Sequence, residues 1–193
     1  MPPKVKTTRE MIIKEAMALV REECYENLNA RALAAKLNCS VQPIFRNFAS
    51  MEDLKKAIVI EVAEDYQNYL KKSMSPDDQL MGLVLAYVTY ARDEKNYFKL
   101  LHMSNRMHLN ETSEFTSVGI NHYIIEAIAK ITNTTLEEAT LIYQGTFFTA
   151  HGIASMVATN QCEFSDEEIQ SILNNVFAGM LTNIKNKETE PHS

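Results

Sequence analysis

NARALAAKLNCSVQPIFRNFASMEDL, residues 29–54, decides the fold of this 193-residue chain. Its first part places apolar side chains three and four residues apart, which is typical of a short helix with one buried face. Asn29 stands in front of that helix as an N-cap. Asn38-Cys39-Ser40 then predicts a three-residue turn, because Asn tolerates the left-handed backbone that ends helices. A second short helix is expected behind the turn and a third near Ser50, so the stretch has the signature of a helix-turn-helix.

The second helix of the pair is expected to be fixed at its start. Ser40 is expected to accept a hydrogen bond from an amide of the first turn. Pro43 fits into that turn, where its missing N–H would have no helical partner. Ile44 and Phe48 are expected to pack inward. The side chains left for solvent or for a DNA groove are then Val41, Gln42, Pro43, Phe45, Arg46 and Asn47.

These residues resemble the N-terminal motif of the TetR family of transcriptional regulators. The matching segments are CYENLN at 24–29, LAAKLNCS at 33–40 and IFRNFASMEDL at 44–54, so the match covers about the first 55 residues. Cys24 and Asn38 stand where the family usually has Gly. Phe45 replaces the usual Tyr, Asn47 the usual His or Tyr, and Met51 the usual Lys. These last three replacements remove groups that commonly contact phosphate in relatives.

The resemblance implies an all-α fold with a three-helix DNA-binding head, residues 1–50, joined by a long helix to a helical effector-binding and dimerisation body, residues 51–190. It implies a sequence-specific regulator of transcription that binds double-stranded DNA as a homodimer. The expected type is a repressor that leaves an inverted-repeat operator when a small, largely apolar effector binds. Two other interpretations stay open: an effector-independent regulator, or a protein-interaction module acting through a partner protein.

The expected DNA contacts lie in the helix-turn-helix and at the start of the helix behind it. Gln42 is expected at a base edge, Val41 and Pro43 at thymine methyl groups, and Arg46 at guanine or phosphate. Phe45 is expected against sugar and backbone, and the amides at 50–52 against phosphate. The full set is Arg31, Ser40, Val41, Gln42, Pro43, Phe45, Arg46, Asn47, Ser50 and Met51. Arg31 has the alternative of a solvated side chain.

Charge is divided unevenly along the chain. The net charge is −6, but residues 1–50 carry eight Lys/Arg and five Asp/Glu, whereas residues 51–193 carry eleven and twenty. The basic end therefore coincides with the motif, as phosphate binding requires. Lys4, Lys6 and Arg9 are expected to follow the DNA backbone as a flexible arm.

Composition limits the other classes of function. No apolar run reaches the roughly 18 residues of a membrane helix, and the N-terminus lacks the apolar segment of a secretory signal, so a cytoplasmic protein without membrane contact is expected. The three cysteines and the histidines have no metal-ligand spacing, and the five glycines are scattered rather than gathered in a phosphate loop. We therefore expect no metal, no cofactor and no enzyme activity.

Helical patterning continues through the rest of the chain. Thr135 and Ser165, each followed by acids, are the strongest helix starts outside the motif. The helices are expected at 8–23, 51–72, 79–92, 95–103, 114–132, 135–159 and 165–187, with a linker at 73–78.

The body offers candidate effector contacts because it is rich in aromatic and methionine residues. FFTAHG at 147–152 also resembles a W-x-x-x-H-G motif of one group of TetR C-terminal domains, with Phe147 in place of Trp. The expected effector residues are Tyr87, His102, Met103, Tyr123, Phe147 and His151. The alternative is that they are ordinary core residues, and that His151 is a partly buried histidine satisfied by a neighbouring carbonyl.

The last two helices each carry a face of small or apolar residues, and small residues permit close helix approach. TetR relatives pair through a four-helix bundle made by these helices, which implies a dimer interface here. Its expected residues are Gly145, Gly152, Met156, Ile169, Leu173, Val176 and Met180. The alternative is packing within one chain.

Overall fold

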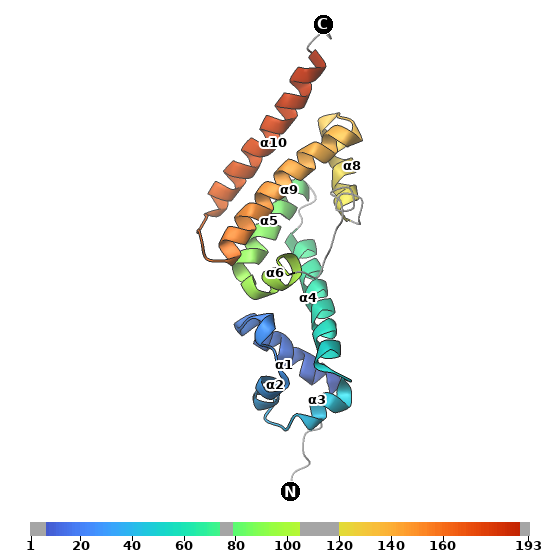
Figure 1. The fold of residues 1–193 in the computed structure, drawn as a ribbon. Helices are drawn as coiled ribbons and strands as arrows, with labels where there is room; N and C mark the ends of the chain where they lie inside the picture. Colours follow the sequence, from blue (N-terminus) through green and yellow to red (C-terminus); the bar gives the residue numbers. More distant parts are fainter. Residues whose placement is uncertain (1–6, 74–78, 105–119, 190–193) are drawn as a thin grey trace. The chain divides into compact units, whose positions relative to one another are not determined.

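The computed structural model describes residues 7–73, 79–104 and 120–189, and every regular element in these ranges is a helix (Figure 1). The predicted all-α fold is confirmed. Within the same ranges, no helix combines the length and apolar character needed to cross a membrane. Of the linker expected at 73–78, Ser73 is still helical, and residues 74–78 lie outside the described residues, as does the start of the helix expected at 114–132.

The chain packs as two compact units, and the first comprises Met1–Tyr69 and Asp93–Ser104. Its elements are α1 (Arg9–Glu22), the 3₁₀ turn η1 (Tyr25–Asn27), α2 (Ala30–Lys36), α3 (Gln42–Asn47), most of α4 (Met51–Ser73) and α6 (Lys95–His102). Helices α1 to α4 each contribute buried apolar side chains to this unit, as the helical spacing predicts. The fully or almost fully buried side chains among them are Ile12, Ala16, Val20, Leu33, Ile44, Phe48, Leu54, Ile58 and Val62.

Helix α6 is fastened to α1 by polar contacts. The Tyr97 hydroxyl donates to Met17 O at 2.9 Å, and Asn96 Nδ2 donates to Arg21 O at 2.9 Å. Arg21 Nε also pairs with Glu94 Oε2 at 2.8 Å. These residues lie more than 70 positions apart in the sequence, so α6 joins the first unit through tertiary contacts. The functional boundary expected at residue 50 stays a prediction.

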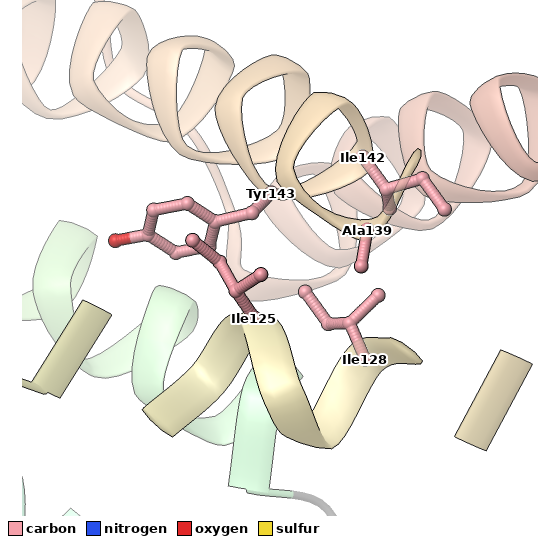
Figure 2. Close-up of a cluster of buried hydrophobic side chains, with 5 residues drawn as sticks. All are labelled: Ile125, Ile128, Ala139, Ile142 and Tyr143. Atoms are coloured by element: carbon pink, nitrogen blue, oxygen red, sulfur yellow. The ribbon is translucent and has the colours of Figure 1, made fainter. Parts of the chain in front are cut away.

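The second unit comprises Leu70–Arg92 and Asn105–Ser193. It contains most of α5 (Gln79–Asp93), together with α8 (Ile120–Thr132), α9 (Leu136–Ala158) and α10 (Asp166–Thr189). Helix α9 packs against both α8 and α10. Figure 2 shows the cluster between α8 and α9, formed by Ile125, Ile128, Ala139, Ile142 and Tyr143. The α10 side chains packed on it are only partly buried and are Phe177, Met180, Leu181 and Ile184.

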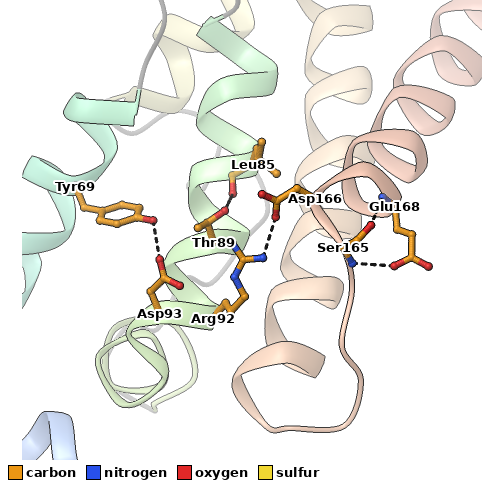
Figure 3. Close-up of polar contacts among 8 residues, drawn as sticks. All are labelled: Tyr69, Leu85, Thr89, Arg92, Asp93, Ser165, Asp166 and Glu168. Atoms are coloured by element: carbon orange, nitrogen blue, oxygen red, sulfur yellow. Dashed lines mark hydrogen bonds and ion pairs between the residues drawn. The ribbon is translucent and has the colours of Figure 1, made fainter.

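Both strong helix starts in this unit are confirmed. Thr135 and Glu138 form a reciprocal capping box at α9. Ser165 and Glu168 do the same at α10, because the Ser165 amide donates to Glu168 Oε2 and the Glu168 amide to Ser165 Oγ (Figure 3). Arg92 Nη1 donates to Asp166 Oδ1 at 2.8 Å and so ties α5 to the start of α10.

Candidate nucleic-acid interface

The turn of the helix-turn-helix begins with a well-capped α2. Asn29 Oδ1 accepts hydrogen bonds from the amides of Arg31 at 3.1 Å and Ala32 at 3.0 Å. The helix ends at Lys36, and Asn38, which follows the C-cap Leu37, has a left-handed backbone with a φ of 50°. Both roles were predicted from the residue types, because an Asn side chain caps amides and an Asn backbone tolerates positive φ.

The predicted capping role of Ser40 is wrong. Helix α3 has Val41 as its N-cap, with a helical backbone (φ −68°, ψ −18°) and no side-chain cap bond. The physical reason lies in Pro43. If Ser40 were the N-cap, Pro43 would stand three residues on, where it has no N–H to donate. Helix α3 therefore starts one residue later, and Ser40 is left exposed.

Helix α3 divides into a buried and an outward face. Ile44 is fully buried, and Phe48, which ends the helix, is almost so. On the other side two large apolar side chains face solvent, Val41 at 36% exposure and Phe45 at 47%. The exposed residues of α3 and its cap are Val41, Gln42, Phe45 and Arg46. This face presents a cation, an amide and two apolar groups, the combination that reads base edges and thymine methyl groups.

Asn47 and Pro43 are half-buried, and Asn47 is turned back on its own helix. Its Nδ2 donates to Pro43 O at 2.8 Å. The main-chain oxygen of Asn47 accepts a hydrogen bond from Arg9 Nη1 at 3.4 Å. Because this amide carries two N–H groups, a phosphate contact by the Asn47 side chain would have to use the N–H that does not donate to Pro43 O.

The start of α4 carries its own acidic groups. The Asp53 amide donates to Ser50 Oγ at 3.1 Å, and Ser50 Oγ donates to Asp53 Oδ2 at 3.0 Å. Glu52 adds a second carboxylate in the first turn, and Met51 is half-buried. Because these carboxylates occupy the positive end of the helix, they compete with a phosphate for it. Arg31 is exposed near the start of α2, without such a competitor on its own first turn.

In the second unit, three of the predicted effector residues lie together. The hydroxyl of Tyr87 and Nδ1 of His151 are 2.7 Å apart, and the Phe147 ring lies 5.3 Å from that of Tyr87. Tyr143 stacks on Phe147 at 5.8 Å and donates its hydroxyl to Asn121 Oδ1 at 2.8 Å. Burial lowers the pKa of His151 and so favours its neutral imidazole. The cluster thus combines aromatic rings with two partly buried polar pairs.

The other three predicted effector residues lie elsewhere. His102 and Met103 belong to the first unit, where the His102 ring is 5.0 Å from that of Tyr66 and 4.9 Å from that of Phe98. Tyr123 is on α8 and is 77% exposed. The sequence did not separate these residues from the cluster, because aromatic character alone does not say which helices meet.

The predicted dimer residues fall into two groups. Ile169 and Leu173 are buried in the chain itself, and Gly145 lies directly against the Met180 side chain. Gly152 and Met156 are exposed, and Val176 is half-buried. Two further apolar side chains of α9, absent from the predicted set, share the helix face of Gly152: Leu141 at 50% exposure and Phe148 at 49%. Their signal was the spacing of seven and four residues along 141, 148 and 152.

Comparison with known proteins supports the resemblance. No family profile matches the chain. It is 29% identical over 89 residues to an uncharacterized HTH-type transcriptional regulator of Mycobacterium tuberculosis, a match that covers 45% of this chain and 41% of the relative. The chain thus spans less than half the length of that curated relative. In three dimensions it is similar to the crystal structure of a TetR-like transcriptional regulator from Rhodococcus sp. RHA1, with a TM-score of 0.63 and 16% identity, covering 94% of this chain and 98% of that one.

Proposed function

The chain has the fold of the TetR-like transcriptional regulators, and from this premise we propose that it is a DNA-binding regulator of transcription. The proposal rests on the difference between the two faces of α3. Ile44 and Phe48 fix the helix in the core, and the opposite face presents Val41, Gln42 and Arg46 together with an exposed aromatic ring. A short helix with this outward face fits the major groove of double-stranded DNA.

The finer proposal assigns readout to individual side chains. Gln42 donates to and accepts from a base edge, Arg46 reaches guanine or phosphate, and Val41 and Phe45 contact thymine methyl groups or sugar. Support comes from their exposure on one helix face. Selecting bound sequences from a random duplex library tests this proposal. An inverted repeat is expected, because a symmetric pair of short helices reads two half-sites.

Point variants then test the assignments on the selected duplex. Gln42→Ala is expected to relax preference at one base position by about 1–3 kcal/mol. Replacing each thymine by uracil removes only a methyl group, so the positions that lose affinity identify the apolar contacts, and Val41→Ala should abolish one such loss. If Arg46 binds phosphate, Arg46→Ala should reduce the salt slope by about 0.9. Lys130→Ala on α8 is the matched charge control. If Gln42→Ala changes neither affinity nor preference, α3 is not the reading helix.

We also propose that the regulator is a repressor released by a small, largely apolar effector. The cluster of Tyr87, Phe147 and His151 supports an aromatic site with one polar pair. A ligand that prefers a conformation of the body to which DNA binds less tightly weakens DNA binding, and DNA then weakens ligand binding by the same factor. The test is mass spectrometry of small molecules that co-purify with the protein, followed by their effect on binding to the selected duplex. The absence of any responsive compound would favour an effector-independent regulator.

Finally, we propose that the chain is a homodimer paired through the exposed face of α9. Leu141, Phe148, Gly152 and Met156 form an apolar face with one small residue, the arrangement that lets helices approach closely. Phe148→Glu is expected to produce monomers in sedimentation equilibrium, because it places a charge in a desolvated contact. Tyr123→Glu, at an exposed ring on α8, is the control and should leave the assembly unchanged.

A further inference from the structure

Helix α3 depends on support from outside itself. It has six residues, of which Ile44 alone is buried. Helices this short are unstable in isolation, so their position is set by tertiary contacts. The inner side is held by the burial of Ile44 and Phe48. Arg9 adds a further contact at the C-terminal end of α3.

Arg9 makes two contacts at that end. Its Nη1 donates to Asn47 O at 3.4 Å, and its guanidinium carbon lies 4.3 Å from the centre of the Phe48 ring. The first contact places a cation beside the partial negative charge of a helix C-terminus. The second adds a cation–π attraction with an aromatic ring that is itself fixed in the core. Arg9 thus connects the first turn of α1 to the last residues of α3.

This arrangement differs from the flexible arm expected for Lys4, Lys6 and Arg9. The two lysines lie outside the described residues, but Arg9 is the first residue of α1, directly after its N-cap Thr8. Its guanidinium is directed at the protein. Since a planar guanidinium both donates to a carbonyl and stacks on a ring, Lys is not an equivalent replacement.

We propose that Arg9 is a positioning residue for DNA readout, which holds the C-terminal end of α3 against α1 and does not itself neutralise a DNA phosphate. The inference rests on the proposed function of α3. Arg9 acts through α3, so its loss affects the ratio between binding to the selected sequence and binding to a scrambled one. A phosphate contact would lower both affinities together.

The test uses the full chain with Arg9→Lys, Arg9→Gln and the control Lys14→Gln, which removes a charge from an exposed position of the same helix. For both Arg9 variants we expect the affinity ratio of selected to scrambled duplex to fall roughly fivefold. Their salt slopes should stay equal to that of the control. The proposal is overturned if Arg9→Lys behaves as the unmodified chain while Arg9→Gln alone loses affinity for both duplexes and about 0.9 of salt slope, the signature of a phosphate contact.

A measurement on the free protein tests whether Arg9 positions α3, independently of whether the protein binds DNA. The Phe48 amide donates to Ile44 O at 3.0 Å and closes α3. Its hydrogen exchange in the free protein, followed by NMR, should be severalfold faster in Arg9→Lys than in Lys14→Gln. Equal exchange rates overturn the positioning role. If exchange responds but the unmodified chain does not distinguish the two duplexes, the proposed function fails and the readout role fails with it. If the unmodified chain distinguishes the two duplexes and the Arg9 variants keep the full affinity ratio, only the role of Arg9 was misassigned.

Discussion

Tyr97→Phe tests the attachment of α6 to α1 by removing one oxygen atom. The Tyr97 side chain is 2% exposed, and its hydroxyl donates to Met17 O at 2.9 Å. Burial raises the pKa of this phenol to about 12 from its ordinary value of 10.0. Arg21 opposes the shift, while Glu94 and Asp65 add to it. The variant therefore changes both the stability at neutral pH and its dependence on alkaline pH.

The substitution has two effects of opposite sign on the free energy of unfolding. At neutral pH the lost hydrogen bond should lower the free energy of unfolding by about 1 kcal/mol. The phenol of the unfolded chain ionises before that of the folded chain, so its contribution is complete below about pH 10 and is lost as the pH rises through about 12. At about pH 11 the unmodified protein has lost roughly 1.4 kcal/mol through Tyr97. The variant escapes that loss, so the two stabilities should converge.

The assay is urea unfolding of both proteins at about pH 7, 9, 10 and 11, followed by circular dichroism. Tyr123→Phe, which removes a phenol that is 77% exposed, is the control and should give a curve parallel to that of the unmodified protein. A constant difference between Tyr97→Phe and the unmodified chain at every pH would refute the reasoning. It would mean that the phenol ionises equally easily in the folded and unfolded states.

Three substitutions test the helix boundaries and helix packing by thermal or denaturant unfolding. Gly152→Ala should stabilise the fold of a single chain by about 1 kcal/mol, because the added Cβ meets nothing within 4 Å. Gly145→Ala should stabilise it less, because its Cβ collides with the Met180 side chain. Equal effects of the two substitutions would contradict this packing. Asn38→Ala should lower the free energy of unfolding by about 1 kcal/mol, whereas Asn38→Gly should not, because φ at this position is 50°. If Asn38→Ala left the stability unchanged, the left-handed geometry would be contradicted. Thr135→Ala should cost about 1 kcal/mol through loss of the α9 capping box, and no loss of stability would show that the cap is replaced by water.

The fold was predictable because the boundaries of its helices are set by residues close to them in the sequence. Asn29, Asn38 and Thr135 act within four positions of themselves, through caps and a left-handed turn. Ser40 failed for an equally local reason, since the cap it offers needs an amide that Pro43 does not have. That error was avoidable from the sequence, and the correction moves the start of α3 by one residue without changing its outward face.

The candidate sites were only partly predictable because their contacts join distant residues. Arg9 and Asn47 are 38 positions apart, and Tyr87 and His151 are 64 apart. Helical periodicity identifies which residues share a face, but the neighbour of that face depends on how the helices pack. For this reason Arg9 was expected in a flexible arm, and His102 was grouped with an aromatic cluster of the other unit.

The predicted dimer residues were limited in the same way, because a sequence pattern does not show what a helix face packs against. An apolar stripe on a helix has the same pattern whether it packs within the chain or against a second copy. Burial separates the two cases here, because Ile169 and Leu173 are already covered within one chain, whereas Leu141 and Phe148 remain half exposed. Association of two copies gains hydrophobic free energy only from surface that is still in contact with water. The pairing energy of the proposed dimer must therefore come mainly from α9 and the half-buried side chains of α10, and substitutions at Ile169 or Leu173 should act through folding rather than through association.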